Sequence, residues 1–168
     1  MLVSIRRVLF PTDFSEPAKH AQQYAMSLAD RFGAELHLLH VVPENPMPFP
    51  DSASSWTLAT TDQQWQVDAA HKQLLHELGP DWPAGQRMVH AAVIGLAVDE
   101  IVKYAQQHEI ELIVIGTHGR TGLSRLLLGS VAEKLIRLAT CPVLTVHPKD
   151  HPFLIDDTRK VQLVPSPK

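Results

Sequence analysis

The chain has 168 residues and a formal net charge of −3, with 45% apolar and 20% charged residues. These values predict one globular domain that buries roughly 70% of its unfolded surface. The slight acidic excess argues against a broad basic face for DNA or RNA, because such a face must neutralise phosphates.

The single cysteine, Cys141, excludes an internal disulfide and fits a reducing compartment. The amino-terminal residues MLVSIRRVLF carry two arginines and lack the apolar core of a secretory signal. No apolar run reaches the about 20 residues that cross a bilayer. We therefore expect a cytoplasmic protein without membrane insertion.

Short apolar runs alternate along the chain with segments whose apolar residues recur every three or four positions. The first pattern predicts strands and the second predicts helices. Ser15 fits the N-cap of the first helix, and Gly33 fits the residue that ends it. Strands are expected over residues 3–10, 34–42, 86–93, 110–115 and 141–147, and helices over residues 16–32, 61–78, 95–105 and 130–139.

This alternation of strands and helices predicts an α/β fold. Right-handed crossovers place the helices on both faces of a parallel sheet. We expect an open, Rossmann-like sheet of five parallel strands in the order 3-2-1-4-5. One domain is expected over residues 1–148, followed by a tail over residues 149–168.

The segment from Pro43 to Pro50 holds four prolines in eight residues and is expected to be a loop. The polar residues 51–55 are expected to continue this loop, which is a candidate mobile insertion or lid. Three tryptophans follow and are expected to cover the core, with an exposed partner patch as the alternative. They are Trp56, Trp65 and Trp82.

Two predicted strands end in residues that favour turns. Pro11, Thr12 and Asp13 follow the first strand, and a segment from Gly116 to Gly119 follows the fourth. Ligands of open parallel sheets lie beyond the carboxyl ends of the strands, where the strand order reverses. If the first and fourth strands are neighbours, the two turns face each other across one crevice.

The glycines from Gly116 onward are spaced G-x2-G-x9-G-S and end at Gly129 and Ser130. Glycine permits positive φ and removes the Cβ that would keep a ligand away. The free N–H groups of a helix beginning at Ser130 would form an anion site. Thr117, Arg120 and Arg125 add donors or charges. Tight turns and a capping box from Ser130 are the structural alternative.

Three separated segments resemble the universal stress protein family, and specifically its ATP-binding subgroup. They are VLFPTDFS from Val8, LLHVV from Leu38 and GTHGRTGLSRLLLGSVAEKLIRLATCPVLTVHP from Gly116. The resemblance covers the chain from about residue 5 to residue 148. It implies an ATP ligand with Mg²⁺ or Mn²⁺ on the phosphates.

The resemblance also implies which residues touch the ligand. Thr12 and Asp13 would meet the adenosine, and the backbone of Val41 would meet the adenine. Glycines and helix amides would hold the ribose and phosphates, while His118 contacts either ligand or solvent. The expected contact residues are Pro11, Thr12, Asp13, Val41, Gly116, Thr117, His118, Gly119, Arg120, Gly129, Ser130 and Val131.

Three functions fit these expectations. The first is an ATP-binding stress or regulatory protein that acts through a dimer and a protein partner not identified by the sequence. The dimer would pair the edge strands that begin at Pro142 and end at His147, as the resemblance implies. The second is a slow ATPase or nucleotidyl-transferring enzyme, and the third is a structural dimer that has lost its ligand. No catalytic residue or metal cluster is expected, because no pair among the ten histidines has metal-ligand spacing.

Overall fold

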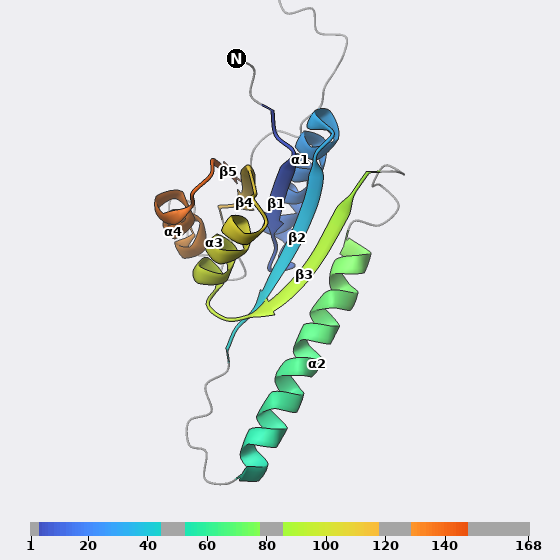
Figure 1. Cartoon of the computed structure of the whole chain (residues 1–168), viewed down its shortest axis with the longest axis vertical. Helices are drawn as coiled ribbons and strands as arrows, with labels where there is room; N and C mark the ends of the chain where they lie inside the picture. Colours follow the sequence, from blue (N-terminus) through green and yellow to red (C-terminus); the bar gives the residue numbers. More distant parts are fainter. Residues whose placement is uncertain (1–3, 45–52, 78–85, 118–128, 148–168) are drawn as a thin grey trace, which may run out of the picture.

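The computed structural model describes residues 4–44, 53–77, 86–117 and 129–147; within the second helix, side chains are described from residue 63 onward. The five strands form one parallel sheet in the order β3-β2-β1-β4-β5, which confirms the predicted architecture (Figure 1). The strands are β1 (Arg7–Pro11), β2 (Glu35–Val42), β3 (Met88–Ile94), β4 (Leu112–Gly116) and β5 (Val143–Val146). The helices are α1 (Glu16–Phe32), α2 (Ala53–Glu77), α3 (Ala97–Gln107) and α4 (Ser130–Leu138).

β1 lies at the centre of the sheet, between β2 and β4. Its residue Val8 pairs with Leu36 of β2 and with Leu112 of β4. The chain order therefore reverses at the boundary between β1 and β4. The carboxyl ends of these two strands meet at one edge of the sheet, where ligands of such folds lie.

Alternate residues of the strands build two separate cores. Val8, Phe10 and Leu36 pack against α1 and α2 on one face, where the buried residues include four alanines of α1 and Leu74 of α2. Leu9 and Leu39 belong to the core on the other face, with α3 and α4 (Figure 1). The sheet is thus covered on both faces, which explains its nearly continuous apolar strands.

α1 shows how the local sequence sets the ends of a helix. The hydroxyl of Ser15 accepts a hydrogen bond from the N–H of Ala18 at 3.4 Å, and Gly33 ends the helix at φ 63°. Both predictions for this helix are confirmed. Its buried face consists mainly of alanine, so the helix axis can lie close to the sheet.

α2 begins at Ala53, eight residues before the predicted start at residue 61. The prediction that residues 51–55 form a loop was therefore wrong from Ala53 onward. Serine and threonine lower helix propensity only by a few tenths of a kcal/mol, roughly, and no proline follows residue 50 until the helix has ended. A helix packed on β2 and β3 can consequently extend back to the proline-rich segment.

Trp65 of α2 is 67% exposed, so the expectation that it covers the core was wrong. The side chain of Trp56 and the whole of Trp82 lie outside the described residues, as do most of the proline-rich loop and the tail. No helix among the described residues combines the length and the apolar character that a bilayer crossing requires.

Candidate functional site

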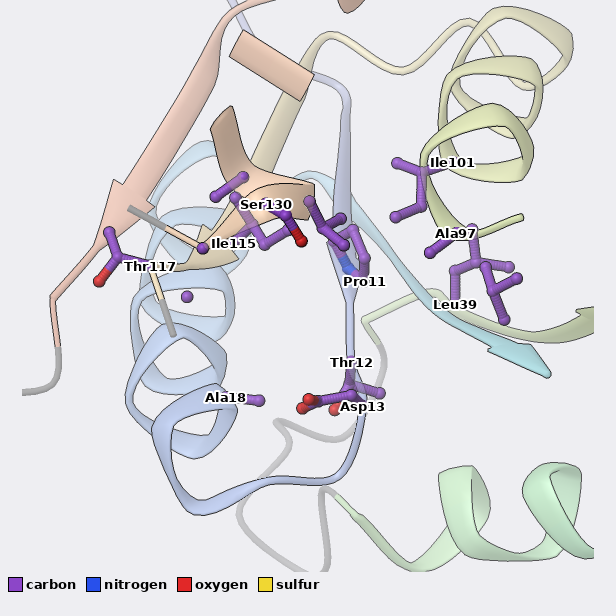
Figure 2. A pocket seen from close by; sticks show the side chains of 15 residues that line it. Pro11, Thr12, Asp13, Ala18, Leu39, Ala97, Ile101, Ile115, Thr117 and Ser130 are labelled. Carbon is purple, nitrogen blue, oxygen red and sulfur yellow. The ribbon is translucent and has the colours of Figure 1, made fainter. Parts of the chain in front are cut away.

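A cavity of about 260 Å³ lies at the carboxyl ends of β1, β2 and β4. It opens between these strand ends and the first residues of α3 and α4 (Figure 2). This is the position that the reversal of strand order predicts for a ligand.

Nine of the twelve predicted contact residues line this cavity. They come from four separate parts of the described chain, so the fold brings together segments more than a hundred residues apart. The nine are Pro11, Thr12, Asp13, Val41, Gly116, Thr117, Gly129, Ser130 and Val131. The other three, His118, Gly119 and Arg120, lie outside the described residues, and so does Arg125.

The cavity also has an apolar floor that the sequence reasoning missed. Its residues come from β2, β4 and three helices, and most are also members of the two cores. They are Ala18, Leu39, Ala97, Ile101, Ile115 and Ala132. The apolar pattern of the sequence does not distinguish residues that line the cavity from residues of the core. Only the position of Leu39 and Ile115 near strand ends could have indicated that they line the cavity.

The turn after β1 forms one wall of the cavity. The N–H of Thr12 donates to the carbonyl of Leu39 at 2.9 Å, which continues the pairing of β1 with β2. The carboxylate of Asp13 accepts from the N–H of Ser15 at 3.0 Å. Asp13 therefore stabilises the turn and also lines the cavity.

The opposite wall joins the end of β4 to the start of α4. The N–H of Gly129 donates to the carbonyl of Thr117 at 2.7 Å, and the N–H of Thr117 donates to Val146 of β5 at 2.9 Å. The first bond joins the two residues that flank segment 118–128, and the second joins Thr117 to β5. Thr117 is 7% exposed and anchored to the sheet.

The capping box from Ser130, which was the structural alternative to an anion site, is not formed. The N-cap is Gly129, with φ −57° and ψ 143°, and no side chain caps this helix. Ser130 is instead the first helical residue and is exposed. The first N–H groups of α4 have no partner within the helix, and they lie at the wall of the cavity, where an anion would satisfy them.

The conformation of Gly129 shows that a positive φ is not the reason for a glycine at this position. Its negative φ is open to other residues, so the backbone conformation does not require glycine. The absence of a Cβ at the cavity wall is the remaining physical advantage. Figure 2 shows Thr12 and Asp13 below Ser130, with the apolar side chains of Leu39 and Ile101 to the right, near α3.

Few ionisable groups line the described part of the cavity. Asp13 is the one ionisable side chain among the described residues that line the cavity. In the described parts of the chain, no three His, Cys, Asp or Glu side chains gather in a way that could hold a metal ion. His37 and His40 are core residues, 3% and 9% exposed.

Cys141 lies outside the cavity lining and is half-buried. Burial raises the pKa of its thiol, although backbone N–H groups partly oppose this effect. A raised pKa lowers the thiolate fraction at neutral pH, which fits a structural rather than a reactive cysteine.

Comparisons with known proteins agree with this architecture. The model of the universal stress protein family matches residues 4–147. Universal stress protein MJ0531 of Methanocaldococcus jannaschii is 35% identical over 84% of this chain and 81% of its own length. Universal stress protein MJ0577 of the same organism is 30% identical over 89% of this chain and 99% of its own length.

Solved structures show the same fold. A structure of MJ0577 superposes with a TM-score of 0.76 and covers 89% of this chain and 100% of its own. A universal stress protein solved in complex with cAMP is 22% identical, with a TM-score of 0.63, and covers 87% of this chain and 99% of its own.

Proposed function

The chain belongs to the universal stress protein family, and from that premise we propose that it is a regulatory protein whose cavity binds ATP. One observation carries the proposal: a single cavity combines an apolar floor, the carboxylate of Asp13 and the uncapped amino terminus of α4. These three features match the three parts of a nucleotide, namely its base, its ribose and its phosphates.

The apolar floor suits a purine base. Leu39, Ile101 and Ile115 present aliphatic surface, and a base buried against them loses contact with water. Val41 lines the same cavity from the end of β2, where its backbone can reach the edge of a base. The same fold has been solved with cAMP in another protein, which supports the capacity of this architecture to hold an adenine nucleotide.

The two polar walls suit the rest of the ligand. Asp13 can accept hydrogen bonds from ribose hydroxyls, because an ionised carboxylate is acceptor-only. The N–H groups of Ser130 and Val131 lie at the start of α4, where the helix dipole favours negative charge. Phosphates at this terminus would replace the missing cap.

A divalent ion would arrive with the triphosphate. Among the described lining residues, the only carboxylate is Asp13, and one of its oxygens already accepts from Ser15. A single carboxylate is not a protein cage, whereas Mg²⁺ normally keeps several waters and binds nucleotide phosphates. The residues present therefore fit Mg²⁺ or Mn²⁺ carried on ATP.

We further propose that the protein acts as a homodimer through β5. β5 is an edge strand of the sheet, and the helix that packs beside it, α4, exposes Ile136 by 51% and Leu138 by 56%. Antiparallel pairing of two β5 strands would give hydrogen-bond partners to the backbone groups at the sheet edge and would cover part of this apolar surface. ATP occupancy at the start of α4 could then be sensed next to the interface.

The test of ATP binding uses the purified chain. Denaturation and chromatography of the supernatant should release ATP, and calorimetry of the emptied protein with Mg²⁺–ATP should give a saturable binding curve. Release of ADP together with measurable turnover would favour the enzymatic alternative. A protein that carries no nucleotide and binds no added ATP would contradict the proposal.

A further inference from the structure

The turn that carries Asp13 contains a residue in an unfavourable backbone conformation. Phe14 has a φ of 63°, a region in which glycine and, less often, asparagine or aspartate are found. A phenylalanine is sterically strained in this region, so surrounding contacts must hold the turn in this shape. The contacts that do so also fix Thr12 and Asp13.

Part of the support is local. The hydroxyl of Thr12 accepts from the N–H of Phe14 at 3.0 Å, and the carboxylate of Asp13 accepts from the N–H of Ser15 at 3.0 Å. These are local hydrogen bonds from backbone N–H groups to side-chain oxygens, of the kind that Thr and Asp favour in turns. They shape the turn but do not connect it to the sheet.

The backbone bond from Thr12 to Leu39 ties the start of the turn to β2, and His40 of β2 adds a side-chain connection. Its Nδ1 atom lies 2.8 Å from the carbonyl oxygen of Thr12, and its ring stacks on Phe14 with centroids 4.4 Å apart and an interplanar angle of 28°. A carbonyl oxygen only accepts, so Nδ1 carries the proton in this bond. His40 is 9% exposed and does not line the cavity.

We propose that His40 is a positioning residue for the nucleoside wall of the cavity. It holds the Thr12 carbonyl through a hydrogen bond and holds Phe14 through ring stacking, and so sets where Thr12 and Asp13 face the ligand. This inference rests on the proposed nucleotide binding and names a residue that acts through the turn. If His40 only filled space in the core, its substitution would lower the stability of the fold but would not selectively weaken binding of the nucleoside.

Two substitutions separate the two contacts. His40→Phe keeps an aromatic ring against Phe14 but removes the donor to Thr12, whereas His40→Asn keeps a donor near the position of Nδ1 and removes the ring. His71→Phe, at an exposed histidine of α2, is the matched control. Calorimetry of each variant would use ATP, adenosine and inorganic tripolyphosphate, with thermal unfolding measured beside it.

The expected result is selective. His40→Phe should weaken adenosine and ATP about tenfold, the effect of losing one hydrogen bond, and leave tripolyphosphate affinity unchanged. His40→Asn should retain adenosine affinity within about threefold, and His71→Phe should match the wild type.

Three outcomes would overturn the inference. Adenosine affinity that is unchanged in His40→Phe would contradict a positioning role. Equal losses for adenosine and tripolyphosphate would indicate a general loss of folding instead. A wild type that binds none of the three probes would reject the proposed function itself, which distinguishes that failure from a failure of His40 alone.

Discussion

The Nδ1 atom of His37 lies 2.9 Å from the phenolic oxygen of Tyr104, while its Nε2 atom lies 2.9 Å from a carboxylate oxygen of Glu35. The carboxylate only accepts, so Nε2 carries a proton and a neutral ring accepts at Nδ1. Burial raises the pKa of Tyr104 to about 12, which keeps its hydroxyl available as the donor. A neutral His37 therefore satisfies both partners inside the core.

Stability should decrease as the pH falls, because burial lowers the pKa of His37 in the folded chain. The hydrogen bond with Glu35 and the negative charge of that residue oppose this effect, whereas electrostatic interactions with His108 and Arg7 add to it. The unfolded chain thus binds this proton first, at about pH 6.5. The stability that neutral His37 contributes is complete above that pH. It is lost as the pH falls toward the lower pKa of the folded chain, at up to about 1.4 kcal/mol per pH unit.

Urea unfolding of the wild type and of His37→Gln between about pH 7.5 and pH 5 measures this contribution. Glutamine keeps a hydrogen-bonding side chain but does not titrate, so its stability should depend less on pH. Parallel pH curves for the two proteins would show that His37 does not carry the effect.

A glycine is required at position 95 both by the backbone conformation and by the lack of space for a Cβ atom. The φ of Gly95 is 154°, and an added Cβ would lie 2.6 Å from the Cγ atom of Glu100. Gly95→Ala should therefore destabilise the chain by about 1–3 kcal/mol, measured by urea unfolding.

Two controls separate strain from collision at Gly95. Gly33 has φ 63° but open space around a Cβ, so Gly33→Ala tests strain alone and should cost less. Glu100→Ala removes the colliding side chain, and Gly95→Ala should cost less in that background. An identical cost in both backgrounds would exclude the collision.

Gly129→Val should weaken ATP binding at least about tenfold while leaving the fold intact. Valine tolerates the φ of −57° and ψ of 143° at this residue, so stability should change little. Its branched side chain would cover the amides at the start of α4. Calorimetry with Mg²⁺–ATP measures the effect, and Thr140→Val, beyond the far end of the same helix, is the control. Wild-type affinity in Gly129→Val would remove α4 from the binding site.

The proposed dimer should be visible in solution. Light scattering at tens of micromolar should give twice the chain mass of 18.7 kDa. Thr145→Asp places a carboxylate on each of two paired β5 strands and should shift the protein to monomer, because like charges on paired strands repel. Thr140→Asp, outside the strand, should stay dimeric. A monomeric wild type would reject the β5 interface.

The parts that the sequence predicted well are those where local chemistry and tertiary structure agree. The apolar, β-branched run of β4 favoured a buried strand, and Gly33 matched the positive φ that ends α1. The carboxyl-end rule then placed Thr12 and Gly129 at one cavity, although they are distant in sequence.

The failures have identifiable causes. The start of α2 depends on packing against the sheet, which weak serine and threonine propensities do not reveal. Ser130 matched a capping box, but the N-cap is Gly129, one residue earlier, whose N–H donates to Thr117. His40 has the sequence context of a core strand residue, and only the fold places it beside the turn that carries Asp13.

A crystal structure grown with excess Mg²⁺–ATP tests the central claim most directly. Adenine should lie against Leu39 and Ile115, the ribose beside Asp13, and the phosphates at the amides of Ser130 and Val131. A cavity that holds only water under saturating ATP, or a nucleotide bound elsewhere on the chain, would contradict it.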